Sequence, residues 1–128
     1  MTSTTASADG RYDVLAEACP TRQVVNRIGD RWSLLVLFAL GNGTLRHQEL
    51  RRAVEGVSQK MLTQTLRTLE REGLVARTVH ATVPPKVEYT LTPLGASLTG
   101  PIAALREWAY DHMTAIEAAR LEFDSREA

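Results

Sequence analysis

The chain has 128 residues, of which 44% are hydrophobic, and its 15 basic and 15 acidic residues give a formal net charge of zero. This length predicts one domain, and no apolar run approaches the ~20 residues that a membrane-spanning helix needs. One cysteine excludes an intramolecular disulfide and a cysteine-rich zinc site, and the three histidines lack metal-ligand spacing. The first residues do not resemble a secretory signal. We therefore expect a cytoplasmic protein that binds no metal or other cofactor.

The neutral total hides an uneven distribution of charge. Residues 22–91 contain eleven basic and six acidic residues, whereas residues 1–21 and 92–128 both carry an excess of acidic residues. A basic middle between acidic ends fits a nucleic-acid surface with its scaffold elsewhere. An excess of five charges can also arise by chance, so the pattern supports this interpretation only modestly.

The N-terminal part of the chain predicts a tail and two helices. Residues 1–11 are small and polar and are expected to be a disordered tail. Pro20 suits the first turn of a helix over 20–28. Asp30 is the expected N-cap of a second helix over 31–40, whose dense apolar content marks the core of the domain.

A helix-turn-helix is expected next. The third helix is predicted over 46–54, with His47 among its inward positions, and a glycine-containing turn at 55–57 joins it to a fourth helix over 58–72. Two short helices joined by such a turn form a helix-turn-helix, in which the second helix is the recognition helix.

The fourth helix carries the most informative pattern. Ser58 can cap its first turn, and Gly73 suits the left-handed residue that ends a helix. One stripe is apolar and contains Leu62, Leu66 and Leu69. The opposite face is polar and basic and contains Lys60, Gln64, Arg67 and Arg71, flanked by Gln59 and Thr63. These side chains suit base edges and phosphates, although the solvated face of any amphipathic helix gives the same pattern.

A two-stranded hairpin is expected after the fourth helix. The strands are predicted over 74–79 and 86–91, and the second alternates apolar and polar residues. Pro84 and Pro85 keep the connecting tip extended. The predicted fold class is therefore mainly α with a small β-hairpin: a winged helix-turn-helix with flanking N- and C-terminal dimerisation helices. This combination favours nucleic-acid binding, although some winged helices bind only proteins.

The C-terminal part predicts a further helix from Thr92-Pro93, interrupted at Gly100-Pro101. An apolar stripe follows at helical spacing and includes Ile102, Leu105, Trp108, Met113 and Ile116. Because the preceding domain already has its core, this stripe favours a homodimer interface. Packing onto the chain's own second helix is the alternative. Residues 12–113 are thus assigned to the DNA-binding domain, and 102–128 to a C-terminal dimerisation helix and tail.

Three motifs are specific in combination. They are Gly29-Asp30-Arg31-Trp32, the segment 57–63, and the segment 83–95 with its proline-proline wing tip. Together they resemble the HxlR-type bacterial transcriptional regulators, winged-helix proteins related to the MarR regulators, over roughly residues 19–112. The resemblance implies a homodimer that binds a palindromic operator, with a dimer interface built from the N- and C-terminal helices. One departure is His47, which stands where the family usually has phenylalanine.

Cys19 is the candidate for signal sensing. It precedes the first helix, where the helix dipole and nearby Arg22 favour the thiolate, but a free cysteine is also often a small buried residue. The resemblance implies that a cysteine at this position senses oxidants, quinones or other electrophiles in several members. With one cysteine per chain, an oxidised form would need a link between two Cys19 residues or a mixed disulfide with a small thiol.

The leading hypothesis is a sequence-specific DNA-binding transcriptional regulator that acts as a homodimer on double-stranded DNA. The major-groove residues would be Lys60, Gln64 and Arg67, with Gln59 and Thr63 beside them. The phosphate-binding residues would be Arg46, Ser58 and Lys86, while the wing would contact the backbone or the adjacent minor groove.

Two alternatives stay open. One is a regulator gated by a small aromatic or hydrophobic effector near Trp32, Phe38 or Trp108, although these aromatic residues are also suited to core and interface packing. The other is a protein-binding winged helix without DNA affinity. An enzyme is not expected, because the chain offers no paired-carboxylate pocket, nucleophile–base pair, glycine-rich phosphate loop or metal cluster.

Overall fold

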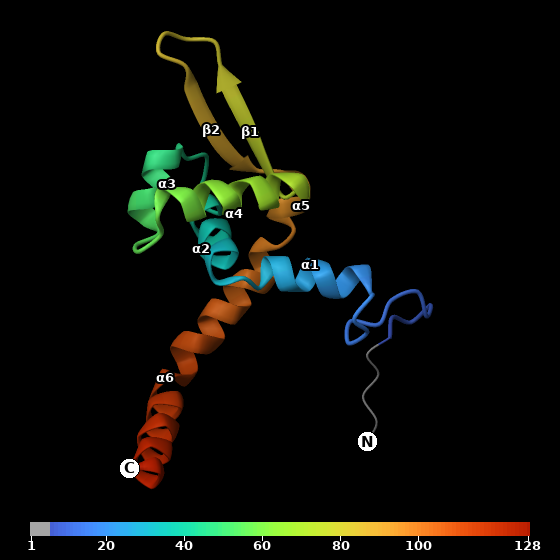
Figure 1. The fold of residues 1–128 in the computed structure, drawn as a ribbon, viewed down its shortest axis with the longest axis vertical. Helices are drawn as coiled ribbons and strands as arrows, with labels where there is room; N and C mark the ends of the chain where they lie inside the picture. Colours follow the sequence, from blue (N-terminus) through green and yellow to red (C-terminus); the bar gives the residue numbers. More distant parts are fainter. Residues whose placement is uncertain (1–5) are drawn as a thin grey trace.

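The computed structural model of the protein describes residues 6–128. Its elements, in chain order, are α1 (Pro20–Ile28), α2 (Arg31–Leu40), α3 (His47–Ala53), α4 (Gln59–Arg71), β1 (Val75–His80), β2 (Lys86–Leu91), α5 (Pro93–Ala96) and α6 (Thr99–Glu127). The fold is mainly helical with one antiparallel hairpin, which confirms the predicted class (Figure 1). No helix within 6–128 is long and apolar enough to cross a membrane.

Helix α2 lies at the centre of the fold and contacts α1, α3, α4, β2 and α6. Its buried apolar residues pack in one cluster with the leucine stripe of α4 and with Leu50 of α3. The cluster includes Val36, Leu37, Leu40, Leu62, Leu66 and Leu69. Burial of each such side chain stabilises the fold by about 1.5–3 kcal/mol, so α4 is held by its apolar stripe and its opposite face stays exposed.

The predicted helix ends are confirmed. The Asp30 carboxylate accepts hydrogen bonds from the backbone N–H groups of Trp32 and Ser33, at 3.1 and 3.4 Å. The Ser58 hydroxyl accepts one from the N–H of Met61 at 3.0 Å. Gly73 has a φ of +78°, the left-handed conformation expected after a helix. These caps satisfy backbone groups that a helix end would otherwise leave unpaired.

The hairpin projects from the body as a wing (Figure 1). Strands β1 and β2 pair from Val75 opposite Leu91 to His80 opposite Lys86. A short extended segment adds to the free edge of β2, because Leu45 and Tyr89 exchange two backbone hydrogen bonds, of 3.0 and 2.8 Å. The wing is therefore anchored to the segment that leads into α3.

The predicted interruption at Gly100-Pro101 is wrong. The break falls earlier, between Ala96 and Thr99, and Gly100-Pro101 lies inside the first turn of α6. Proline is tolerated there because the first N–H groups of a helix have no intrahelical partner. Helix α6 then runs to Glu127, so the separate C-terminal tail expected after the dimerisation helix is not present as such.

The predicted disordered tail lies partly outside the described residues. Residues 6–11, which are described, form a turn that precedes α1. The N–H of Ser7 donates to the carbonyl oxygen of Tyr12 at 2.6 Å, and the N–H of Tyr12 donates to the Ser7 hydroxyl at 3.0 Å. Short polar side chains close such local turns by hydrogen-bonding to nearby backbone, so this part of the tail has defined structure.

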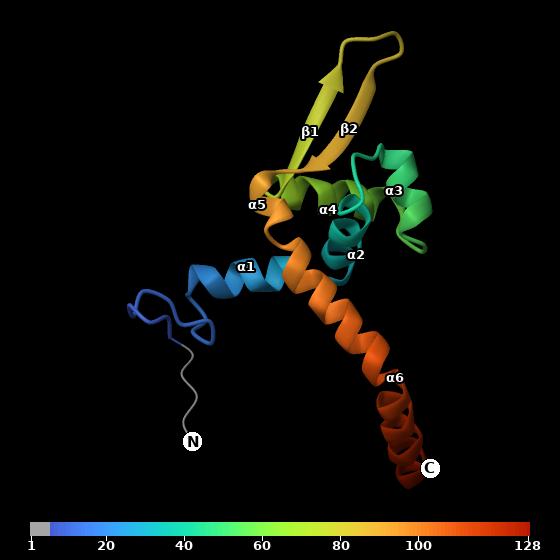
Figure 2. The ribbon, with the colours of Figure 1, turned by 180° about the vertical axis from the view of Figure 1, so that it is seen from behind.

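The C-terminal end of α6 and the wing lie at opposite ends of the molecule (Figure 1). Figures 1 and 2 show α1 and α6 leaving the body on the side away from the wing, with the C-terminal part of α6 standing clear of the other elements. A surface around α4 and the wing is therefore separate from a surface built on α1 and α6.

Candidate nucleic-acid interface

The outward face of α4 is polar and basic. Lys60, Gln64, Arg67 and Arg71 are all exposed, whereas the leucines on the opposite side of the helix are at most 2% exposed. Ser58, which caps this helix, keeps its hydroxyl proton available for a further acceptor, because the bond to Met61 uses only its oxygen as acceptor. The helix thus presents donors over its whole exposed length.

The two flanks of this face lie against different parts of the molecule. Gln64 lines a groove of about 330 Å³ together with Arg27 and Asp30. Thr63 and Arg67 line a cleft of about 360 Å³ on the other side, beside the wing. The exposed face of α4 therefore lies between the α1–α2 connection and the hairpin.

Arg77 of β1 is a basic residue that the sequence analysis did not select. It is exposed, lies opposite Tyr89 in the hairpin, and lines the same cleft as Arg67. The period of two in a strand places Arg77 on the same face as the buried Val75, but it does not show that Arg77 lies beside Arg67. Glu70 also lines this cleft, so its charge is not uniformly positive.

His47 joins α3 to the recognition helix. Its Nε2 lies 3.1 Å from the hydroxyl oxygen of Thr63, with the donor set by the tautomer of the ring. Partial burial lowers the pKa of His47, and the nearby positive charge of Arg51 lowers it further. His47 is half-buried at the rim of the core, while Leu50 of the same helix is fully buried. The inward position predicted for His47 therefore corresponds to a contact between α3 and α4.

The three predicted phosphate ligands lie in different places. Ser58 caps the N-terminus of α4. Arg46 is exposed at the N-terminus of α3, and its backbone N–H donates a hydrogen bond to the Glu49 carboxylate at 2.8 Å. Lys86 lies at the start of β2, near the wing tip, and its ammonium is 3.9 Å from the carboxylate of Glu88. The structure therefore separates Lys86 from the residues of α3 and α4.

Cys19 occupies the N-cap position of α1 and is only 8% exposed. Burial raises the pKa of its thiol, but the backbone N–H groups of Arg22, Asp13 and Thr21 favour the thiolate. The hydrogen bonds outweigh the effect of burial, so the pKa of the Cys19 thiol lies below its ordinary value. Cys19 therefore has features of both a small buried residue and a reactive thiol, because it is buried and its surroundings favour the thiolate.

The predicted interface residues of α6 divide into three groups. Ile102 is 7% exposed and packs in the core of its own chain. It faces α2 because the first turn of α6 docks on the body. Leu105 and Trp108 are exposed, at 51% and 53%. Met113 and Ile116 are half-buried.

Residues 6–128 contain no group of three or more histidine, cysteine, aspartate or glutamate side chains that could hold a metal ion. The arrangement instead offers exposed hydrogen-bond donors on a capped helix beside a two-stranded wing.

A helix-turn-helix followed directly by a hairpin defines the class of winged helix-turn-helix proteins. The sequence matches the HxlR-like helix-turn-helix family over residues 27–117, most of the chain. The protein belongs to this family, as its motifs predicted. The family consists of transcriptional regulators and not of enzymes.

Similar proteins support the same assignment. The HTH-type transcriptional regulator YtfH of Escherichia coli (strain K12) is 44% identical over 110 residues, which cover 86% of this chain and 87% of YtfH. The solved structure of the transcriptional regulator ytfH from Salmonella typhimurium has 45% identity and a TM-score of 0.76, covering 82% of this chain and 94% of that one. The redox regulator HypR in its reduced form has 35% identity and a TM-score of 0.72, covering 77% and 98%.

Proposed function

We propose that the protein binds double-stranded DNA sequence-specifically, through α4 in the major groove, and regulates transcription in the cytoplasm. The observation that carries this proposal is the exposed polar and basic face of α4, held between the α1–α2 connection and the wing. Arginine and lysine contact guanine or phosphate, and glutamine can pair with adenine.

The contacts divide into two sets. Lys60, Gln64 and Arg67 are proposed to contact bases, with Gln59 and Thr63 beside them. Arg46 and Ser58 are proposed to hold phosphates near the helix-turn-helix, and Lys86 is proposed to hold a phosphate near the wing tip. Arg77 joins this proposal because it lines the cleft beside Arg67.

We propose that the functional unit is a homodimer on a palindromic operator. Exposed apolar residues on the two helices that leave the body support this: Val24 and Val25 of α1, and Leu105, Trp108 and Phe123 of α6. Exposed apolar surface on helices that extend from a domain marks an interaction site. A two-fold axis between two such domains would pair their recognition helices with two half-sites about one helical turn apart.

Fluorescence anisotropy with labelled DNA from the region flanking the protein's own gene tests the proposal. We expect salt-dependent binding that a duplex of the same composition and scrambled sequence competes for poorly. Equal competition by the scrambled duplex would contradict sequence-specific recognition. Absence of salt-dependent binding to any duplex would favour a winged helix that binds proteins.

We also propose that oxidation at Cys19 switches DNA binding. Its lowered pKa supports this, as does the likeness to a structure described as a redox regulator. Two Cys19 thiols of a dimer would lose two protons and two electrons to an added oxidant such as diamide, forming a disulfide between subunits. The anisotropy titration is repeated with diamide on the wild type and on Cys19→Ser, and an identical response of both proteins would remove Cys19 from the mechanism.

A further inference from the structure

The side chains of His47 and Thr63 meet at the edge of the exposed face of α4. His47 is the first residue of α3, and its Nε2 lies 3.1 Å from the hydroxyl oxygen of Thr63, which follows 16 positions later in the chain. His47 is half-buried, whereas Thr63 is exposed. The contact therefore joins the rim of the core to a residue of the surface proposed to face DNA.

This contact fixes the direction of the Thr63 hydroxyl. A hydroxyl both donates and accepts hydrogen bonds, so it pairs with Nε2 in either tautomer of a neutral ring. A threonine in a helix otherwise divides between two rotamers, because its hydroxyl can also bond to a carbonyl oxygen one turn earlier. Within residues 6–128, His47 is the one hydrogen-bond partner of the Thr63 side chain. The packing of α3 against α4 therefore selects one rotamer of Thr63.

The methyl group of Thr63 then points away from His47. The hydroxyl and the methyl group are both bonded to Cβ, so a rotamer that directs one of them directs the other as well. Thr63 also lines the cleft beside the wing together with Arg67 and Arg77, whose guanidinium groups suit guanine and phosphates. In the major groove, a threonine methyl group is suited to the C5-methyl group of thymine. With its hydroxyl held by His47, Thr63 thus offers its methyl group to a base.

We infer that His47 is a positioning residue that directs the methyl group of Thr63 towards a thymine in each half-site of the operator. His47 itself does not contact the base in this arrangement. Its ring holds the hydroxyl on the side of α4 that faces α3, and the methyl group of Thr63 packs against that of the thymine. The inference rests on the proposed function, because it concerns how α4 reads DNA.

Replacement of thymine by uracil, which lacks only the C5-methyl group, tests this arrangement. Duplexes that bind the full wild-type chain are first selected from a random library, and their common sequence defines the half-site. Each thymine of the half-site is then replaced by uracil, in both half-sites together, and fluorescence anisotropy measures the affinity. We expect a position at which the replacement weakens binding about tenfold, the contribution of two buried methyl groups.

Two variants at Thr63 test the methyl group. Thr63→Ser keeps the hydroxyl but has no methyl group, so it should bind the thymine and uracil duplexes alike at that position. Thr63→Val has a methyl group in place of the hydroxyl and keeps the original one, so it should still prefer thymine. Thr114→Ser, which removes a methyl group from an exposed threonine of α6, is the matched control and should keep the wild-type ratio of affinities.

His47→Phe tests the positioning role, because phenylalanine keeps an aromatic ring but has no nitrogen. It should reduce the thymine-to-uracil ratio of affinities about fourfold, a factor of two per half-site, because Thr63 then divides between two rotamers. In the Thr63→Val background, where both positions hold a methyl group, His47→Phe should leave the ratio unchanged.

Three outcomes would overturn the inference: no thymine whose effect Thr63→Ser abolishes, a wild-type ratio in His47→Phe, or an equal effect of His47→Phe in the Thr63→Val background. Thermal unfolding shows whether each variant is folded, and the Thr63→Ser result decides the matter if His47→Phe is not. Failure to select any sequence would refute the proposed function, whereas a selected sequence without such a thymine refutes only this inference.

Discussion

Arg27 at the end of α1 and Glu72 at the end of the recognition helix α4 form an ion pair, with 2.9 Å between Nη1 and Oε1. The two side chains are 39% and 13% exposed, so the pair is partly shielded from water. Arg71 also lies near this carboxylate, at 3.4 Å. The contact connects the N-terminal helix α1, whose N-cap is Cys19, to the helix proposed to contact DNA.

The ion pair should contribute modestly to stability. We expect Arg27→Ala and Glu72→Gln to be coupled by about 0.2–1 kcal/mol in a double-mutant cycle, because a pair that is half open to water gains little Coulomb energy. Urea unfolding of the wild type, the two single variants and the double variant measures this coupling. Strictly additive effects would show that the contact does not stabilise the folded chain.

Arg67→Ala should weaken operator binding without unfolding the protein. Its side chain is exposed on α4, so truncation removes a proposed base contact, at a cost of about 1–3 kcal/mol of binding free energy. Anisotropy titrations at several salt concentrations measure the affinity and its salt dependence. Arg120→Ala is the matched control on α6, and equal affinity of the two variants would contradict the placement of Arg67.

Gly95→Ala should destabilise the fold strongly. A Cβ at this position would lie 2.0 Å from the backbone oxygen of Leu74, which also accepts a hydrogen bond from the N–H of Thr92 at 3.0 Å. Such overpacking against backbone should cost about 3 kcal/mol or more.

Gly100→Ala is the control, because a Cβ there meets no heavy atom of the described chain within 4 Å beyond its adjacent residues and the nearby backbone of its own helix, α6. It should stabilise the protein by about 0.5–1 kcal/mol. Denaturant unfolding compares the two variants, and similar midpoints would refute the close approach of Gly95 to Leu74.

His47 should make the protein less stable in mild acid. Because the pKa of His47 is lowered in the folded chain, the unfolded chain binds its proton first as the pH falls below about 6.5. The free energy of unfolding therefore decreases with falling pH, from the ordinary pKa down through the lowered one, and is unaffected at higher pH.

His47→Gln tests this dependence, because its amide can still reach Thr63 but does not titrate. The difference in unfolding free energy between pH 7.0 and 5.5 should be smaller in the variant than in the wild type. His80 and His112 are present in both proteins, so their contributions cancel. Equal pH dependence would show that His47 titrates alike in the folded and unfolded chains.

The elements of this fold were largely predictable because their signals are local. Asp30, Ser58 and Gly73 mark helix ends through bonds to residues within a few positions, and a helical period places Leu62 and Leu66 in one stripe. Local signals also misled, since Gly100-Pro101 has the composition of a break but lies in a first turn, where proline costs no hydrogen bond.

The candidate interface was predictable only in part. Periodicity identified the exposed face of α4, but it could not place Arg77 beside Arg67, because 10 positions of chain and a turn separate them. Nor could it show that Ile102 belongs to the core of its own chain while Leu105, one turn later, is exposed.

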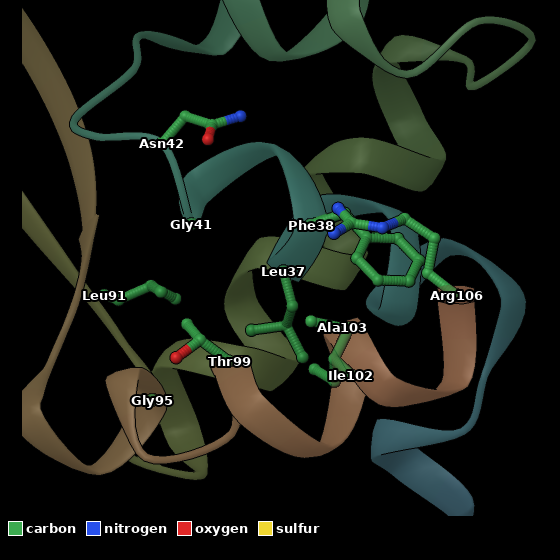
Figure 3. Close-up of a pocket in the computed structure, with 10 residues that line it drawn as sticks. All are labelled: Leu37, Phe38, Gly41, Asn42, Leu91, Gly95, Thr99, Ile102, Ala103 and Arg106. Atoms are coloured by element: carbon green, nitrogen blue, oxygen red, sulfur yellow. The ribbon is translucent and has the colours of Figure 1, made fainter. Parts of the chain in front are cut away.

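The sequence by itself determined the winged helix-turn-helix class, the capped recognition helix and the polar face of that helix, because each depends on residues close together in the chain. Only the tertiary structure decided which helix faces are covered and which side chains from distant segments meet. Thus His47 meets Thr63, Arg27 meets Glu72, and a pocket forms beside Arg106 (Figure 3). Such contacts depend on how α2 packs against α4, the wing and α6 at once, and that packing is a property of the whole core.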